Sequence, residues 1–304
     1  MIRPELRPLG VGEIIDAAIK LVRGNARVLF TIAAVVLVPL GILQAFVTSS
    51  FGGNDLLSLA MPLPVDPATD PEALDDLLDS ALNLLALTGL IAVTAAVGAV
   101  LVQGASVKAL ADIYQGVEPE WPNSITFGFR RFFSILGATL MIGVASALGL
   151  IFCIAPGVWL FTSWSVTMPA LVVEHKGAFA AMGRSFELVR RRFWPTLGTV
   201  ALAYLVYYAV EQVISLAVTL ITFAGAAESG TISLVGSVIG STISSILVLP
   251  FLAAVLTVLY FDLRVRAEGY DLEVMAAELG VDGSSIPPPV DPGDPFGLGT
   301  PGPE

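Results

Sequence analysis

Long blocks of apolar residues, bounded by charged or turn-forming residues, recur six times along the chain. A block of about 20 apolar residues is long enough to cross a lipid bilayer as an α-helix. The six predicted spans cover about residues 28–48, 82–107, 133–152, 157–173, 196–222 and 234–260. A tight turn at 153–157 joins the third span to the fourth. Pro250 predicts a kink in the sixth span, because proline removes a backbone donor.

Composition supports the same interpretation. Of the 304 residues, 55% are hydrophobic and 13% are charged, whereas soluble domains contain about 25% charged residues. A soluble protein of this length needs more polar surface than this chain supplies. We therefore predict an all-α integral membrane protein with six transmembrane helices.

Short amphipathic segments precede the first, third and fifth spans. Residues 14–23 precede the first span at the same distance as residues 181–190 precede the fifth, and residues 130–137 before the third resemble residues 191–198. As helices, these segments place polar and apolar positions on different faces, which is typical of helices that lie on a membrane surface. The prediction is three tandem units, each an amphipathic surface helix followed by a membrane hairpin.

The remaining segments complete the predicted organisation. Its parts are a cytoplasmic amphipathic segment at 1–27, a six-helix membrane domain at 28–263, a cytoplasmic helix at 264–280 and a tail at 281–304. Within the membrane domain, an external acidic loop at 49–81 ends in a helix that begins near Asp70 and continues into the second span. The tail contains seven prolines and five glycines and no base, so it is predicted to be disordered.

The basic residues predict the orientation. All 15 lysines and arginines fall on one side of the six-span arrangement, and the connections on the other side carry only acids. Lysine and arginine favour cytoplasmic segments, so both termini of this multi-pass plasma-membrane protein are predicted to be cytoplasmic. Four bases near the fifth span are predicted to face anionic lipid in the cytoplasmic leaflet: Arg184, Arg190, Arg191 and Arg192. The alternative is that their segment only anchors and orients the spans.

The sequence has no group of residues whose spacing is typical of a catalytic or metal-binding motif. There is one cysteine, Cys153, and one histidine, His175, and the sequence has no glycine-rich phosphate loop and no nucleophile elbow. We therefore expect no enzymatic activity, no cofactor and no metal. Nucleic-acid binding is not expected either, because membrane topology already explains the positions of the bases.

Glu211 is an exception to the apolar character of the spans. It lies near the middle of the fifth span, where a charged side chain costs about 3 kcal/mol on insertion scales. Residues at helical spacing form a polar stripe with it: Tyr204, Tyr207, Tyr208 and Ser215. Gln44 and Gln103, in the first and second spans, are placed where they could face it. One interpretation of the stripe is a site that binds a proton or a substrate. The other is a structural role, in which a neutral Glu211 forms hydrogen bonds between helices.

Small residues recur at close-packing intervals in two spans. The sixth span has Gly236 and Gly240 together with Ser233, Ser237, Ser241 and Ser244, and the second has Gly89, Ala92, Ala96 and Ala99. Such faces let helices approach closely, and a homodimer contact would have the same pattern. A homo-oligomer is therefore one expectation. Two tryptophans, Trp159 and Trp194, are predicted to lie near opposite membrane borders.

Three motifs resemble a known family. The opening motif lies at residues 7–14 (RPLGVGEI), the central one at 174–194 around Arg184-Ser185, and the closing one at 262–272 (DLRVRAEGYDL). Together they are similar to actinobacterial integral membrane proteins labelled as carrying a glycerophosphoryl diester phosphodiesterase membrane domain. The enzymes that gave this label hydrolyse their substrate in a separate soluble barrel, and this chain resembles the membrane part only. The resemblance implies a membrane module that works beside cell-envelope enzymes, in an actinobacterial plasma membrane.

Three functions from different classes follow from these observations. The first is a non-catalytic scaffold or auxiliary subunit for cell-envelope or lipid-related machinery, with a membrane or envelope protein as its partner. The second is a permease or lipid transporter that uses the stripe around Glu211. The third, an intramembrane enzyme, is the least supported, because the chain lacks a catalytic constellation.

Overall fold

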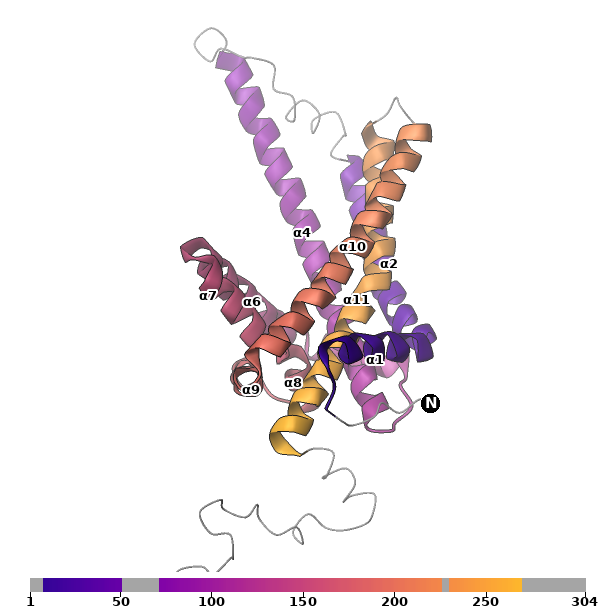
Figure 1. Cartoon of the computed structure of the whole chain (residues 1–304). Coiled ribbons are helices and arrows are strands. Elements are labelled where there is room, and N and C mark those ends of the chain that lie inside the picture. The colour runs from indigo at the N-terminus through magenta and orange to yellow at the C-terminus, as the bar shows by residue number, and fades with distance from the viewer. Residues whose placement is uncertain (1–7, 51–70, 226–229, 270–304) are drawn as a thin grey trace, which may run out of the picture.

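The computed structural model describes residues 8–50, 71–225 and 230–269 of the chain, and these residues form helices and turns without a strand (Figure 1). The helices are α1 (Val11–Gly24), α2 (Ala26–Ser50), α4 (Pro71–Tyr114), α5 (Trp121–Arg130), α6 (Phe132–Phe152), α7 (Ile154–Ser163), α8 (Thr167–Val173), α9 (Ala178–Arg190), α10 (Phe193–Gly225) and α11 (Gly230–Glu268). Six segments are long and apolar enough to cross a membrane. The predicted fold class, all-α with six spans, is confirmed.

The predicted organisation is only partly within the described residues. Residues 1–7, most of the predicted acidic loop (51–70) and the predicted disordered tail lie outside them. The helix expected near Asp70 begins at Pro71 and continues without a break into the second span, as α4. No separate helix begins at residue 264, because residues 264–268 are the last turns of α11. Pro250 lies inside α11, which continues through it, and the kink stays a prediction.

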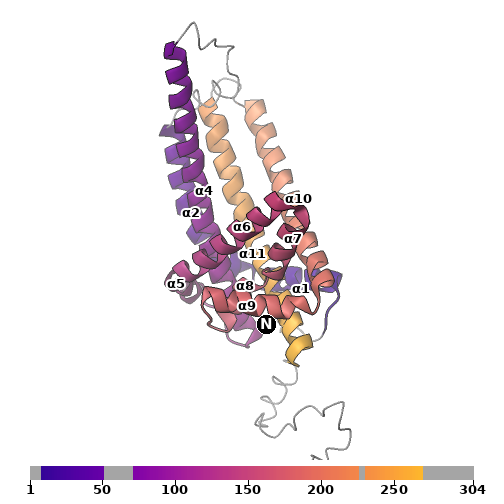
Figure 2. The same cartoon turned by 90° about the vertical axis from the view of Figure 1, so that its left-hand side faces the viewer.

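α11 is the central helix of the molecule. It packs against α10, α2, α4 and α1 (Figures 1 and 2). Every residue from Leu252 to Leu263 is buried, and a helix that is buried all round has to be apolar on most of its faces. Tyr260 and Phe261 are the largest fully buried side chains of this stretch. The second half of α11 is therefore the core to which the other helices attach.

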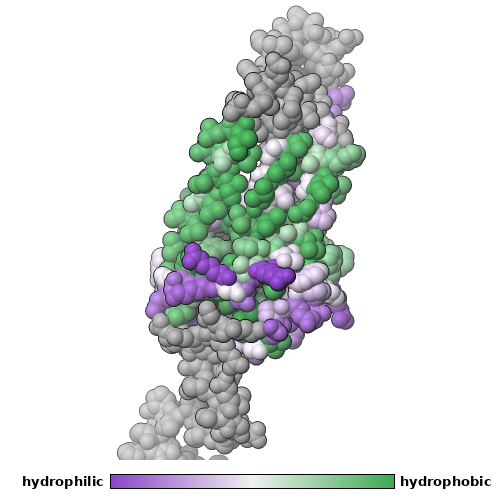
Figure 3. All heavy atoms as spheres, turned by 90° about the vertical axis from the view of Figure 1, so that its right-hand side faces the viewer, coloured by the Kyte–Doolittle hydropathy of each residue, from purple (hydrophilic) through white to green (hydrophobic). Residues whose placement is uncertain are grey.

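The described lysines and arginines gather at one end of the bundle, which we call the basic end. This end comprises α1, the start of α2, the last turns of α4, α5, α8, α9 and the last turns of α11 (Figures 1 and 2). Above it, the long helices present an apolar surface, and hydrophilic side chains form a band where that surface stops (Figure 3). This separation is the one expected of a chain that crosses a bilayer.

The short helices of the basic end are docked on the bundle. α1 buries Ile14, Ala18 and Leu21, and it packs against α11 and α10. α9 buries Leu188 and Val189 and packs against α8. The sequence predicted their amphipathic character, but it assigned the apolar faces to lipid, whereas the structure uses much of them for protein packing. The description of these elements as three tandem repeats stays a prediction.

The fourth span is broken, which the sequence interpretation missed. α7 ends at Ser163, α8 begins at Thr167, and a turn at 164–166 separates them. Pro169 explains the position of the break, because proline has no N–H to donate and its ring clashes with the carbonyl four residues earlier, that of Ser165. The turn before α7 is also tighter than predicted, since only Cys153 separates it from α6.

Close approaches between helices occur at some of the predicted small residues. A Cβ added at Gly240 would lie 2.6 Å from the Val218 side chain of α10, so α10 and α11 approach closely there, as predicted. A Cβ at Gly89 would meet nothing within 4 Å, and Ala92 and Ala96 are exposed. Ala99 is half-buried, so most but not all of the predicted packing face of α4 is unpacked within the described residues.

The two tryptophans do not lie at opposite borders, contrary to the prediction. The Trp159 ring packs edge-on against Phe186 of α9, with 5.7 Å between ring centroids. Trp194 is the second residue of α10, which begins three residues after the end of α9. Both tryptophans therefore lie toward the basic end. The prediction was wrong because it assumed an unbroken fourth span.

Candidate functional site

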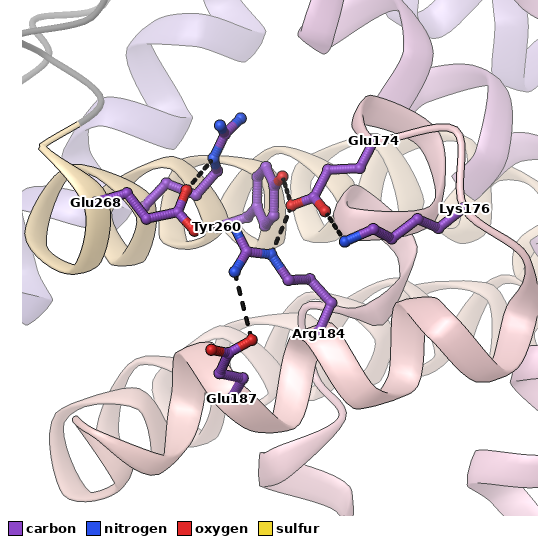
Figure 4. Close-up of polar contacts among 7 residues, drawn as sticks. Glu174, Lys176, Arg184, Glu187, Tyr260 and Glu268 are labelled. Atoms are coloured by element: carbon purple, nitrogen blue, oxygen red, sulfur yellow. Dashed lines mark hydrogen bonds and ion pairs between the residues drawn. The ribbon is translucent and has the colours of Figure 1, made fainter. Parts of the chain in front are cut away.

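Seven polar side chains from three parts of the chain meet at the basic end. We call them the basic-end network: Glu174, Lys176, Arg184, Glu187, Tyr260, Arg264 and Glu268. The first two come from the connection between α8 and α9, the next two from α9, and the last three from the end of α11 (Figure 4). The network therefore joins α8 and α9 to the central helix.

Glu174 and Arg184 are at the centre of the network. The Tyr260 hydroxyl donates to Glu174 Oε1 at 2.7 Å, and Arg184 Nε donates to the same oxygen at 2.8 Å. Lys176 pairs with the other oxygen of Glu174. Arg184 also pairs with Glu268 of α11 and lies 3.6 Å from a carboxylate oxygen of Glu187 (Figure 4). The side chains of Glu174 and Arg184 are only 14% and 15% exposed, so the pair is largely shielded from water.

Local sequence explains how these side chains converge. Tyr260, Arg264 and Glu268 are four residues apart and therefore share one face of α11; Arg264 Nε donates to Glu268 at 3.1 Å. His175 has a φ of 51°, in the left-handed region that few non-glycine residues adopt. This conformation turns the chain sharply after α8, so that Lys176 points back to Glu174.

A second contact fixes the N-terminal segment to α11. Asp262, buried in the bundle, accepts the backbone N–H of Leu9 at 2.7 Å and Nε of Arg266 at 3.0 Å. Arg266 in turn donates to the backbone carbonyl of Leu9 at 2.8 Å. Both backbone groups of Leu9 are thus held by one carboxylate and one guanidinium. Leu9, Arg184 and the 262–268 segment belong to the three motifs identified in the sequence, so the structure brings all three motifs together at the end of α11.

The electrostatics of the network favour its charged form. Burial alone raises the pKa of Glu174, but hydrogen bonds from Arg184, Lys176 and Tyr260 outweigh it and lower the pKa from 4.5 to about 2. Burial tends to lower the pKa of Arg184, and its bonds to Glu174 and Glu268 more than reverse this, so its pKa is raised. Each carboxylate of the network faces a donor, an arrangement that suits holding helices together.

The pKa of Glu174 predicts how stability depends on pH. A carboxyl whose pKa is lower in the folded state stabilises the fold above its ordinary pKa, and it loses this contribution as pH falls toward the folded value. For Glu174 this interval runs from pH 4.5 to about pH 2. We expect the thermal unfolding midpoint in detergent to fall more steeply over this interval in the parent than in Glu174→Gln. Parallel curves for the two proteins would contradict the assignment.

A second polar region lies within the membrane, between α10 and α11. Glu211 lines a cavity of about 100 Å³ together with Ser215 of α10 and Ser237, Gly240, Ser241 and Ser244 of α11. The Tyr207 hydroxyl hydrogen-bonds Glu211 from one turn away. The groups that face Glu211 across the helix interface are thus the serines of α11, which the sequence interpretation treated only as packing residues.

The structure divides the predicted polar stripe. Glu211 and Ser215 line the α10–α11 cavity, and Tyr207 lies within reach of it. Tyr204 lines a different cavity, and Tyr208 is 57% exposed on the outer face of α10. Gln103, which the sequence placed opposite Glu211, lies beside Tyr204 in that other cavity. The stripe is therefore not one continuous site.

The predicted lipid-facing cluster is also divided. Arg184 is engaged in the basic-end network, whereas Arg190 and Arg191 are exposed at the end of α9 and Arg192 is half-buried. We therefore leave Arg184 out of any lipid-facing group. The sequence interpretation did not single out Glu174, Tyr260 or Glu268. The four-residue spacings within 260–268 were a readable signal for the α11 face, but the partners on α8 and α9 could not be read from spacing.

Comparison with known proteins agrees with this picture. Residues 135–274 match the family model described as the membrane domain of glycerophosphoryl diester phosphodiesterase. The matched segment runs from α6 through α11 and contains the whole basic-end network. The family resemblance stated from the motifs is confirmed over this segment. No curated protein and no solved structure matches the chain.

Proposed function

We propose that this multi-pass membrane protein is a non-catalytic scaffold or auxiliary subunit for cell-envelope or lipid-related machinery in the plasma membrane. The observation that carries the proposal is the convergence of the three motifs on one joint at the end of α11, where charged groups pair with each other. In a chain that used these groups for chemistry, we would expect a carboxylate or base directed at an open site.

In this proposal the basic end lies in the cytoplasm, with both termini, because lysine and arginine favour that side. The pairing of Glu174, Arg184 and Glu268 makes α8, α9 and α11 one rigid platform. Its outer surface includes Glu187, whose side chain is 61% exposed. A partner protein of the membrane or cell envelope docks there, and a homo-oligomer is the alternative occupant.

The partner can be tested at the exposed edge of the basic-end network, with Glu174 and Arg184 kept in place. A photo-crosslinking amino acid at Glu187, introduced into the full chain in cells, should give one discrete protein adduct that mass spectrometry identifies. The matched control is the same amino acid at Leu82, which is 62% exposed on α4 near the opposite end. Lipid adducts alone at position 187, or the same protein adducts at both positions, would contradict the proposal. An adduct with a second copy of this chain would identify a homo-oligomer.

The exposed arginines at the end of α9 are proposed to contact anionic lipid. Arg190 and Arg191 lie where the apolar surface of α10 begins, which is the depth of lipid headgroups. Arg190→Gln/Arg191→Gln should co-purify with less anionic lipid than the parent, as measured by mass spectrometry. Arg23→Gln/Arg27→Gln, the same charge change near α1, is the control. Equal lipid loss from both pairs would indicate attraction by net charge only.

A specific observation favours one alternative, a permease or lipid transporter. Glu211 lies beside a serine-lined cavity in the membrane-spanning part of the bundle, and ionisable residues in such positions are often part of transport pathways. Glu211 separates the two proposals, because a scaffold needs its hydrogen bonds but not its charge.

A further inference from the structure

A cavity of about 180 Å³ lies at the break in the fourth span, and the functions above make no use of it. Six elements enclose it: α4, α6, α7, α8, α10 and α11. Its polar lining includes Gln103, Ser165 and Tyr204, and its apolar lining includes Phe161, Met168 and Leu256. Polar groups converging in a mostly apolar cavity are the usual features of a small-molecule site.

The cavity is a consequence of the Pro169 break. In a straight helix, Trp164 and Ser165 would continue α7, but the break turns α8 away and leaves both residues lining the cavity. Irregular backbone at membrane depth is tolerated where it lines such a space. In some transporters, interrupted helices of this kind form the binding site.

Ser165 has an unmet hydrogen-bonding capacity. Its hydroxyl oxygen is buried and has no hydrogen-bond partner within the described residues. The two threonine hydroxyls of the lining are occupied: Thr139 donates to the carbonyl of Ile135, and Thr167 to that of Trp164. A buried unsatisfied hydroxyl costs free energy, so a ligand that pairs with it gains affinity.

The depth and charge of the cavity indicate its ligand. Lys108 is the base that ends the apolar stretch of α4, and Gln103 lies five residues before it. Five residues correspond to about 7.5 Å along the helix axis. This places the cavity just inside the apolar zone, at the level of the glycerol and ester groups of lipids in the leaflet at the basic end. No charged residue of the described chain lines it, so a phosphate or other ionic headgroup would be buried without a partner.

We propose that this cavity binds an uncharged lipid of the diacylglycerol class. The cavity of about 180 Å³ has room for the glycerol end of such a lipid, and the acyl chains would extend from it past the apolar lining into the bilayer. The glycerol hydroxyl and the ester carbonyls would bond to the Gln103 amide and the Ser165 hydroxyl, which offer both donors and an acceptor. The proposal does not depend on a partner protein, and it fits a scaffold as well as a transporter.

Trp164 supplies a reporter, because it lines the cavity while Trp121, Trp159 and Trp194 are exposed. With those three changed to Phe, the full chain is placed in phosphatidylcholine nanodiscs. A low mole fraction of chain-brominated diacylglycerol should quench Trp164 fluorescence more than the same fraction of brominated phosphatidylcholine or phosphatidic acid. Equal quenching by all three lipids, or strongest quenching by phosphatidic acid, would overturn the proposal.

A matched pair of glycine variants tests the location. Gly143 lines the cavity, and a Cβ there would meet nothing within 4 Å. Gly143→Leu should therefore direct an apolar side chain into the cavity and abolish the selective quenching. Gly137→Leu, on the same helix and equally unobstructed but outside the cavity lining, should retain it. Selective quenching that survives in Gly143→Leu would place the lipid elsewhere.

Ser165→Ala separates recognition from packing. If the hydroxyl is only an unsatisfied group, its removal leaves diacylglycerol affinity unchanged. If it binds the lipid, affinity falls about threefold, the equivalent of one hydrogen bond in a membrane. Stability should not fall in either case, since the hydroxyl has no protein partner within the described residues. Unchanged affinity would refute the assignment of Ser165.

Discussion

Replacing Arg184 with alanine should lower the thermal unfolding midpoint of the detergent-solubilised chain by roughly 6–12 °C. The guanidinium pairs with Glu174 and with Glu268, and its side chain is 15% exposed. Removing the guanidinium takes one donor from each of two largely shielded carboxylates, and breaking a shielded ion pair costs about 3 kcal/mol. A loss of that size corresponds to roughly 2–4 °C per kcal/mol in a protein larger than 150 residues.

Two further variants make this prediction specific. Arg184→Lys keeps the charge but cannot donate from one planar group to Glu174 and Glu268 together, so it should lie between the parent and Arg184→Ala. Lys20→Ala removes a base at the same end from a pair with Asp16 whose side chains are 67% and 61% exposed, and it should change the midpoint little. Equal effects of Arg184→Ala and Lys20→Ala would show that the basic-end network does not stabilise the fold.

The spans were predictable because their signal is local. A run of apolar residues favours lipid over water whatever the rest of the chain does. The start of α4 near residue 71 was also predictable, because the residues that mark a helix N-terminus near Asp70 are adjacent in sequence. The signal for the break in the fourth span is also local. Pro169 stands four residues after Ser165, but hydropathy alone hides it, since one proline changes the mean hydropathy of a long apolar block only slightly.

The partners of the charged side chains could not be predicted in the same way. Asp262 and Arg266 are one turn apart, and their pairing is readable from spacing. Their joint contact with the backbone of Leu9, more than 250 residues earlier, depends on how α1 docks on α11. Likewise, Arg184 was grouped with the lipid-facing bases because it lies in the same amphipathic segment as Arg190, Arg191 and Arg192. Only the fold shows that it turns toward Glu174 and Glu268.

These contacts between residues far apart in sequence explain the role of the motifs. The residues that made the resemblance recognisable include Leu9, Arg184, Asp262 and Arg266, and in the structure these form the joint between the N-terminal segment, α9 and α11. A charged motif in a membrane protein invites an interpretation as a catalytic site. Here the geometry of the motif residues accounts for them as connections between helices.

Replacing Glu211 with glutamine should leave the chain stable and functional if the scaffold proposal is correct. Glutamine keeps the shape of the side chain and accepts a hydrogen bond from Tyr207, but it cannot ionise. Glu211→Leu has no acceptor for that hydroxyl and presents an apolar group to the serine-lined cavity. We expect the free energy of unfolding to fall by at most about 1 kcal/mol per hydrogen bond in Glu211→Leu, and not to fall measurably in Glu211→Gln. Thermal unfolding in detergent measures both.

Functional measurements distinguish the scaffold from the permease, whereas stability measurements do not. The readouts are complementation of a deletion strain and the protein adduct formed from position 187. A scaffold keeps both in Glu211→Gln, because the α10–α11 cavity does not include the surface of α9 that is proposed to bind a partner. A permease that moves a proton or a cationic substrate past Glu211 loses complementation in Glu211→Gln while its thermal midpoint stays at the parental value. Since glutamine preserves the hydrogen bond and removes only the charge, a stable but inactive Glu211→Gln would replace the scaffold proposal with transport.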